Sequence, residues 1–413
     1  MKAIIVIGDG MADRPISELG GKTPLQVARK PSIDKLPRLG ISGIMDPISP
    51  GIPAGSDTSH LAILGYDPYK YYQGRGAFEA LGAGLEVGLG DISFRGNFAT
   101  VDNDLVVTDR RAGRIGNSDA DELAKSLDGI RLDDFPDVQV VFKHTVEHRC
   151  AIILKGPRLS RMVSDSDPEG ERQKIHVVKN LDQSSEALRT SSIINELTKR
   201  FHQILENHPV NTRRRVAGLP PANAILFRGA GTVPKATPIT ETYNIKALVI
   251  AAGALYKGVC RAVGMDTIEV KGATGTYETD TVAKARAAVE SLSKYDYILV
   301  HVKGTDNAAH DGNFKQKIAM IEKIDALIDY LLKNVDLSET FIAITADHTT
   351  SCDWKEHMGD PVPISITGPE IRVDSVERFS EVDCAQGGLG RIRGINITPI
   401  LMDLIGKSKK FGE

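Results

Sequence analysis

The sequence predicts an α/β fold, in which a doubly wound, mostly parallel sheet is built from both ends of the chain and a second α/β domain is inserted between them. Two observations lead to this prediction. Near-continuous apolar runs alternate with helical patterns in residues 1–71 and again in 241–413, as is typical of strands covered on both faces by helices. Residues 72–240 instead show glycine breaks and alternating strands, which indicates a separate domain.

Length, charge and cysteine usage limit the classes of protein to which this chain can belong. A chain of 413 residues is too long for one ordinary core, and 51 Lys and Arg against 54 Asp and Glu give no basic field for nucleic acid. The four cysteines show no C-x-x-C spacing, which favours free thiols in a reducing cytoplasm. No apolar run approaches the roughly 20 residues that span a bilayer. We expect a cytoplasmic protein with no membrane or nucleic-acid partner; its oligomeric state stays open, a homo-oligomer included.

The first 45 residues alternate between strand and helix patterns. Residues 4–7 form an apolar run that reads as a buried strand and is too short for a signal peptide. Pro24 and Pro31 stand where the first turn of a helix tolerates proline, and apolar residues keep a helical spacing from Ile33 up to Gly40. A second strand is expected over residues 41–45. This alternation is the opening of a doubly wound domain.

Ser56 follows a loop rich in proline and glycine, residues 46–55. The apolar spacing after it, ending at Gly65, predicts a short helix with Ser56 at its N-terminus. Unpaired N–H groups and the helix dipole at such an end favour a phosphate and a hydroxyl that is losing its proton. Ser56 is therefore a candidate nucleophile. Capping of the helix by the same side chain is the alternative.

The inserted region begins with a glycine-rich segment, Gly74 to Gly90, which we expect to act as a hinge. Its expected strands are 92–101, 105–108, 138–142, 151–154 and 224–227, and an amphipathic helix is expected over 188–205. After residue 241 the buried strands return at 246–251, 296–302 and 340–345, with a one-sided apolar helix over 318–331.

Three of the buried strands are followed by an aspartate, namely Asp9, Asp306 and Asp347. The carboxyl ends of parallel strands line one crevice, so these carboxylates are expected to converge there and to need cations. Histidines accompany them at His310, His348 and His357. Oxygen and imidazole ligands without thiolate suit Mn²⁺, Zn²⁺, Mg²⁺ or iron. Two metals would polarise a phosphoryl group and lower the pKa of the Ser56 hydroxyl.

Two other kinds of site fit the sequence less well. Gly8-Asp9-Gly10 lacks the G-x-G-x-x-G spacing of a dinucleotide site. A Ser/His/Asp hydrolase using Ser56 and His60 is formally allowed, but it leaves the carboxylate cluster unexplained.

Several motifs resemble the alkaline phosphatase superfamily, including Val6 to Gly10, Pro31 to Leu36, Thr345 to His348 and His357 to Pro363. With Gly55 to His60 and Gly74-Arg75-Gly76, the whole chain resembles the archaeal type of 2,3-bisphosphoglycerate-independent phosphoglycerate mutase. The resemblance implies an alkaline-phosphatase-like core, an inserted substrate-clamping lid and an isomerase that interconverts 3-phosphoglycerate and 2-phosphoglycerate through phosphoserine. It also implies two divalent metals, manganese by preference with Zn²⁺, Mg²⁺ and Co²⁺ as alternatives, and no 2,3-bisphosphoglycerate.

The resemblance assigns residues by motif. One metal would be held by Asp9, Ser56, Asp347 and His348, and the other by Asp306, His310 and His357. Ser56 is the expected catalytic residue. Candidate substrate-binding residues are Arg110, Arg111, Arg114, Arg149, Arg228 and Lys257, of which Arg228 and Lys257 resemble substrate residues of the bacterial form. A metal-dependent phosphohydrolase or phosphotransferase on the same core, and a non-catalytic metal-binding descendant, are the alternatives.

Overall fold

The computed structural model describes residues 1–412 and divides into two compact units, Met1–Tyr72 together with Ala236–Glu413, and Gln73–Lys235. Each unit has its own sheet and its own buried core. The four cysteines are free and buried, as the sequence predicts. Within residues 1–412, no helix has both the length and the apolar composition needed to cross a membrane.

The first unit is built on an eight-stranded sheet with the order β15-β2-β14-β11-β1-β10-β8-β9. These strands are β1 (Lys2–Gly8), β2 (Gly40–Asp46), β8 (Ala247–Ile250), β9 (Asp266–Thr267), β10 (Tyr297–Val302), β11 (Thr340–Ala346), β14 (Val362–Thr367) and β15 (Gly390–Arg393). All neighbours pair in parallel except β14, which runs antiparallel to β11 and β2. A two-stranded ribbon, β12 (Thr349–Ser351) with β13 (Glu356–Met358), follows β11. The expected mostly parallel sheet is confirmed.

Helices surround this sheet. They are α1 (Pro24–Val27), α2 (Lys35–Arg38), α3 (Ser56–Ile63), α4 (Pro68–Tyr71), α9 (Ile239–Thr242), α10 (Ala254–Ala262), α11 (Thr281–Ser291), α12 (Gly304–His310), α13 (Phe314–Asn334), α14 (Glu381–Cys384) and α15 (Ile397–Leu404), with 3₁₀ turns at Ser17–Leu19 and Gly394–Asn396. Helix α13 packs against α11 and α12, and α3 packs against α10. Strands β10 and β11 are buried along their whole length, and β1 is buried apart from its first residue. This burial explains their continuous apolar sequences.

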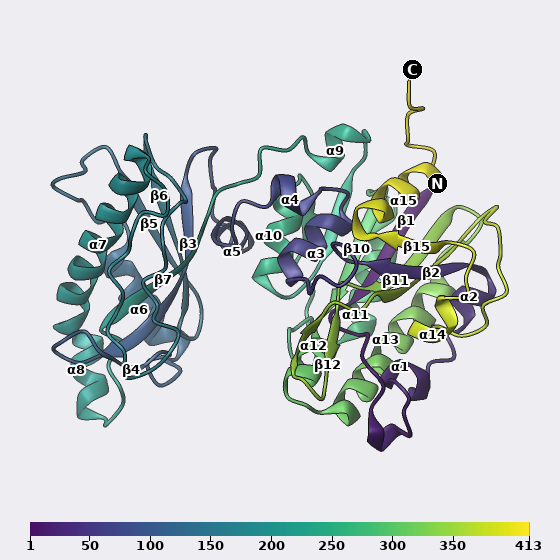
Figure 1. Cartoon of the computed structure of the whole chain (residues 1–413), viewed down its shortest axis with the longest axis horizontal. Helices are drawn as coiled ribbons and strands as arrows, with labels where there is room; N and C mark the ends of the chain where they lie inside the picture. The colour runs from purple at the N-terminus through teal and green to yellow at the C-terminus, as the bar shows by residue number, and fades with distance from the viewer. Residues whose placement is uncertain (413) are drawn as a thin grey trace. The chain divides into compact units, whose positions relative to one another are not determined.

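The three central strands end level with one another. In Figure 1 the N-terminal strand β1 lies between two strands from the second half of the chain, β10 and β11. The register places Gly8 of β1 beside Val302 of β10 and beside Ala346 of β11. The residues that follow these strands therefore share one edge of the sheet, including Asp9 and Asp347.

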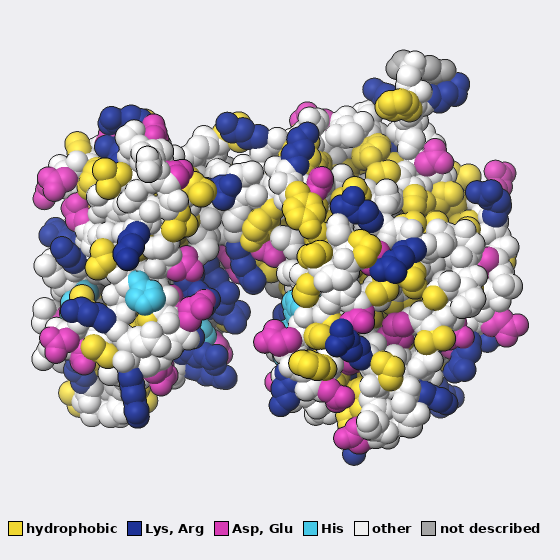
Figure 2. Space-filling view, in the orientation of Figure 1, with side chains coloured by type: hydrophobic (Ala, Val, Ile, Leu, Met, Phe, Trp, Pro, Cys, Tyr) yellow, Lys and Arg dark blue, Asp and Glu magenta, His cyan; other side chains and the backbone are white. Residues whose placement is uncertain are grey.

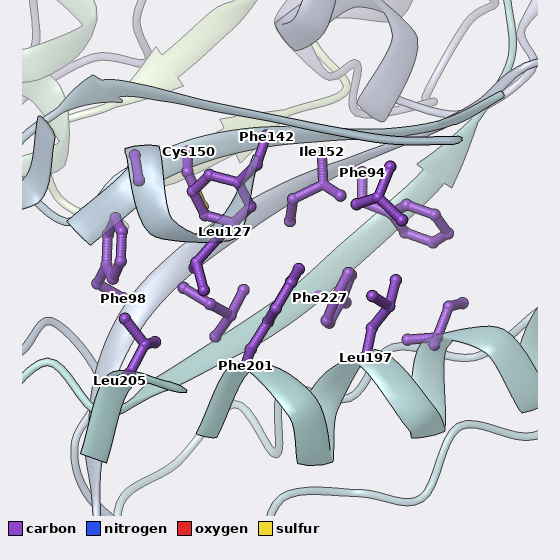
Figure 3. Packing of buried hydrophobic residues seen from close by; sticks show 14 of the residues in the cluster. Phe94, Phe98, Leu127, Phe142, Cys150, Ile152, Leu197, Phe201, Leu205 and Phe227 are labelled. Carbon is purple, nitrogen blue, oxygen red and sulfur yellow. The ribbon is translucent and has the colours of Figure 1, made fainter. Parts of the chain in front are cut away.

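The second unit holds an antiparallel sheet in which β3 pairs with β4, β6 and β7, and β6 also pairs with β5. Its elements are α5 (Gly76–Gly82), β3 (Ile92–Val101), β4 (Val107–Asp109), α6 (Asn117–Leu127), β5 (Gln139–Val146), β6 (Arg149–Lys155), α7 (Ser185–Glu206), α8 (Pro209–Val216) and β7 (Ala224–Gly231). Figure 3 shows side chains of α7 packed against one face of this sheet. The rings of Phe201 and Phe227 stack there with centroids 5.9 Å apart.

The glycine-rich segment expected as a hinge contains helix α5, which packs on β3 and β7. Two of its glycines have a packing reason. A Cβ at Gly74 would lie 2.1 Å from the Ala230 carbonyl oxygen, and one at Gly76 would lie 2.1 Å from that of Ser93. Any larger residue would push the segment off the sheet.

Candidate active site

Ser56 is the first residue of helix α3, and Gly55 occupies the N-cap position without a side-chain cap. The Ser56 hydroxyl does not bond to the helix backbone, so the capping alternative is excluded. Its Oγ lies instead 3.2 Å from Nε2 of His348, and only 8% of the residue is exposed. The nucleophile candidate therefore faces the carboxylate cluster expected from the sequence.

Asp9, Asp347 and His348 meet beside Ser56. Nε2 of His348 lies 3.4 Å from Oδ1 of Asp9 and 3.3 Å from Oδ2 of Asp347, and all three residues are fully buried. Within residues 1–412, neither of these two carboxylate oxygens has a hydrogen-bond partner. Buried oxygens left unpartnered are costly, so the arrangement fits a bound cation.

The backbone and a threonine orient this cluster. Oδ1 of Asp347 accepts from the backbone N–H of Gly10 at 2.9 Å, which turns Oδ2 toward His348. The Thr350 hydroxyl donates to Oδ1 of Asp306 at 3.0 Å and therefore accepts from Nδ1 of His348 at 2.9 Å. Because Nδ1 carries the proton, the lone pair of His348 Nε2 points into the cluster.

Asp306, His310 and His357 form a second cluster. Oδ1 of Asp306 lies 3.3 Å from Nε2 of His310 and 3.4 Å from Nε2 of His357. The Nδ1 atoms donate to backbone carbonyls, that of His310 to Lys355 and that of His357 to Ala54. Both Nε2 atoms are thus turned toward Asp306 as candidate ligand atoms, and they lie 3.2 Å apart. Asp306 and His310 share one face of α12 by their spacing of four residues.

The electrostatics of the two clusters match a cation site. Burial raises the pKa of Asp347 well above its ordinary value, and the nearby Asp9 adds to this effect. Burial acts on Asp9 in the same direction, but Lys303 and His301 outweigh it and hold the pKa of Asp9 below its usual range. Burial lowers the pKa of His348 to about 3, so its imidazole is neutral.

In the second cluster, the hydrogen bond to Asp306 raises the pKa of His310 to about 9. Burial lowers the pKa of His357, but its hydrogen bond to Asp306 outweighs this effect and raises that pKa. Imidazoles and carboxylates without thiolate suit hard or borderline divalent metals, which displace the second imidazole proton on binding.

Three further side chains surround Asp9 and were not predicted from the sequence. Oδ2 of Asp9 accepts from the Tyr256 hydroxyl, from Nε2 of His301 at 3.1 Å and from Nζ of Lys303 at 3.3 Å. Two of these residues, His301 and Lys303, are polar at the end of an otherwise apolar run, which was the available signal.

His60 does not form the triad that a Ser/His/Asp hydrolase would need. Its Nδ1 lies 2.7 Å from the backbone oxygen of Ser56, and its Nε2 has no partner. Burial lowers the pKa of His60 to about 3. The imidazole therefore contacts the serine backbone and not the hydroxyl that it would have to deprotonate.

The predicted substrate-binding residues differ from one another in their burial and in their partners. Arg110 and Arg228 both pair with the buried Asp167, and Arg228 also pairs with Glu169. Lys257 is buried on α10, with its Nζ 2.5 Å from Glu269. The side chains of Arg111, Arg114 and Arg149 are exposed.

A set of polar residues on β3 was not predicted from the sequence. Ser93, Arg95 and Asn97 alternate along the strand and so share the face opposite the aromatic core, and each has a buried polar atom without a partner. Among residues 1–412, Nδ1 of the buried His148 also has no hydrogen-bond partner, although it lies 3.8 Å from a carboxylate oxygen of Glu147. Burial is the main cause that lowers the pKa of Arg95 to about 10. Glu79 acts in the opposite direction, and the charges of Arg75, Arg149 and Arg228 lower the pKa further. Lys and Arg side chains gather on the surface of this unit in Figure 2.

Proteins of known family match the whole chain. A family model described as 2,3-bisphosphoglycerate-independent phosphoglycerate mutase matches residues 38–211. The protein named 2,3-bisphosphoglycerate-independent phosphoglycerate mutase 1 from Methanocaldococcus jannaschii is 49% identical over 411 residues, covering 100% of this chain and 99% of its own. The Pyrococcus furiosus protein named 2,3-bisphosphoglycerate-independent phosphoglycerate mutase is 49% identical over 412 residues, with coverage of 100% and 99%.

Solved structures agree with these sequence matches. A protein structure from Pyrococcus horikoshii has a TM-score of 0.87 at 43% identity and covers 100% of this chain and 99% of its own. The cofactor-independent phosphoglycerate mutase from Thermoplasma acidophilum has a TM-score of 0.74 at 37% identity, with coverage of 98% and 100%. The predicted fold class and family are confirmed, and the chain belongs to the 2,3-bisphosphoglycerate-independent phosphoglycerate mutase family.

Proposed function

We propose that this protein interconverts 3-phosphoglycerate and 2-phosphoglycerate, with Ser56 as the carrier of the phosphoryl group. The activity follows from family membership. The observation that supports the carrier is the position of the Ser56 hydroxyl, opposite His348 and beside the unpartnered oxygens of Asp9 and Asp347. A serine in these surroundings can lose its proton and attack phosphorus.

Two divalent metals, manganese by preference, would occupy the two clusters. Asp9, Ser56, Asp347 and His348 would hold one, and Asp306, His310 and His357 the other. When bound, the metals supply positive charge that stabilises the Ser56 alkoxide and the transferring phosphoryl group. The unpaired cysteines are in keeping with a reducing cytoplasm.

The chain itself carries out a balanced pair of transfers. Ser56 Oγ forms a bond to the substrate phosphorus and loses its proton, while the ester bond to glycerate breaks and the released glycerate oxygen gains a proton. The other glycerate hydroxyl then forms a bond to this phosphorus and loses its proton, while the bond from phosphorus to Ser56 Oγ breaks and Oγ regains a proton. Water must be kept out during this exchange, because hydrolysis of phosphoserine would turn the mutase into a phosphatase.

The second unit is proposed to hold the glycerate carboxylate. Arg95, with the neighbouring Arg149 and Arg228, offers guanidinium groups that suit a carboxylate, and the unpartnered Ser93 and Asn97 atoms leave hydrogen-bonding capacity for the hydroxyls. This set adds Arg95, Ser93 and Asn97 to the residues expected from the sequence, and it includes two of the expected arginines, Arg149 and Arg228. Arg110 and Arg228 both pair with Asp167. Arg228 keeps its place in the proposal.

Arg95→Met is expected to raise the KM for 3-phosphoglycerate about tenfold to a hundredfold, since a charge-assisted bond to substrate is lost. Both metals should be retained. Arg213→Met is the control, because Arg213 pairs with Glu122 on the surface of the same unit. Steady-state kinetics in both directions measure the effect. An unchanged KM in Arg95→Met would remove this residue from the substrate site.

His357→Ala is expected to lose one of two bound metals and most turnover. Its Nε2 belongs to the second cluster, and His310 can replace it only in part. Elemental analysis and calorimetric titration with Mn²⁺ measure the stoichiometry. His176→Ala, in the second unit, is the control and should bind both metals. Two undisturbed sites in His357→Ala would contradict the assignment.

A coupled assay tests the proposed activity as a whole. Purified protein loaded with Mn²⁺ should form 2-phosphoglycerate from 3-phosphoglycerate without added 2,3-bisphosphoglycerate. Release of inorganic phosphate faster than formation of 2-phosphoglycerate would instead identify a phosphohydrolase. Equal absence of turnover in metal-free and metal-loaded samples would point to a non-catalytic protein.

A further inference from the structure

Lys303 lies between the two clusters. It follows strand β10 directly and is the N-cap residue of α12, the helix that carries Asp306 and His310. Its Nζ lies 2.8 Å from Oδ2 of Asp306 and 3.3 Å from Oδ2 of Asp9. One ammonium group therefore joins a carboxylate of the first cluster to a carboxylate of the second.

Lys303 contacts one oxygen of each carboxylate, and the other oxygen of each carboxylate is turned toward the histidine ligands. In Asp9, Oδ2 contacts Lys303 while Oδ1 is turned toward His348. In Asp306, Oδ2 contacts Lys303 while Oδ1 is turned toward His310 and His357. Lys303 can therefore stay in place whether or not metals are present.

We propose that Lys303 is a built-in counter-ion that links the two metal sites and keeps them assembled before metal binds. The inference rests on the proposed function in that it takes the two clusters as metal sites. Without metal, two buried carboxylates would lie close together, and the shared ammonium group offsets their repulsion.

The same charge must act against the metals. A fixed positive charge that contacts ligands of both sites repels each incoming divalent cation. Lys303 should therefore stabilise the metal-free protein and weaken metal binding. A residue that only oriented the ligands would have the opposite effect on affinity, since its loss would loosen the site and weaken binding. The sign of the change in affinity separates the two roles.

Tyr256 supplies the matched control. Its hydroxyl donates to the same oxygen of Asp9 that Lys303 contacts, and its ring lies 5.5 Å from the Lys303 Nζ. Tyr256→Phe removes a neutral donor without removing charge. It should weaken Mn²⁺ binding through loss of orientation, while Lys303→Met should strengthen it.

The experiment compares full-length wild type, Lys303→Met, Lys303→Arg and Tyr256→Phe. Lys303→Met should lower the melting temperature of chelator-treated protein by at least about 4 °C, because two carboxylates lose their shared cation. Calorimetric titration should show Mn²⁺ bound at least about tenfold more tightly by Lys303→Met than by wild type. Lys303→Arg keeps the positive charge, so its Mn²⁺ affinity should lie between those of wild type and Lys303→Met. A Lys303→Met protein that folds only with Mn²⁺ would be the extreme form of the expected result.

Unchanged or weaker Mn²⁺ binding in Lys303→Met, or an unchanged melting temperature without metal, would overturn the counter-ion role. Wild-type protein that binds no divalent metal would instead contradict the proposed function. In that case the melting temperatures would still report whether Lys303 holds the carboxylates together, so the two failures are distinguishable.

Discussion

Ser56→Ala is expected to lower interconversion of the phosphoglycerates by more than about a thousandfold, since it removes the proposed phosphoryl carrier. The fold should remain, because the Ser56 hydroxyl does not cap α3 and, in the described part of the chain, is hydrogen-bonded only to the His348 imidazole. Turnover from a coupled assay, together with circular dichroism and metal content, measures the effect.

Ser59→Ala is the control for this variant. Ser59 is fully buried on the same helix, and its hydroxyl donates to the Ser56 backbone carbonyl at 3.2 Å. Its loss should alter stability slightly and leave most of the turnover. Retention of more than a few per cent of activity by Ser56→Ala would rule out the phosphoserine route.

Removal of metal is the second change with a large expected effect. Prolonged chelation should abolish turnover, and Mn²⁺ should restore it, because the carboxylates would otherwise face the phosphoryl group unneutralised. Asp347→Asn should lose the first metal and at least about a thousandfold in turnover, since an amide replaces a buried carboxylate whose Oδ2 is unpartnered.

Asp329→Asn, which changes a surface carboxylate paired with Lys333, is the control for Asp347→Asn. It should behave as wild type in both metal content and turnover. Full activity of the chelated wild-type protein, verified as metal-free by elemental analysis, would contradict a role for metals.

The convergence of the three aspartates could be predicted from the sequence because it depends on a general property of parallel sheets. Asp9 and Asp347 follow strands whose last residues lie beside each other, and Asp306 enters on the helix after the third strand. The spacing from Asp306 to His310 is short enough for a helix to fix. Local pattern and strand direction were sufficient here.

Other site residues depend on contacts that no local pattern encodes. Tyr256 comes from α10 and reaches Asp9 across 247 residues of sequence. On β3, Arg95 gains its arginine neighbours through pairing with β6 and β7, which are distant in the chain. The sequence prediction named Arg149 and Arg228 but not Arg95, because the strand pairing that brings these three arginines near one another cannot be read from local sequence.

The most direct test of the account is the mass of the protein during turnover. Wild-type protein with Mn²⁺ and 3-phosphoglycerate, quenched rapidly in acid, should carry one phosphoryl group, and peptide mapping should place it on Ser56. The quenched Ser56→Ala protein should carry none. A wild-type protein that turns over while remaining unmodified, or that is phosphorylated at another residue, would contradict the claim that Ser56 carries the phosphoryl group.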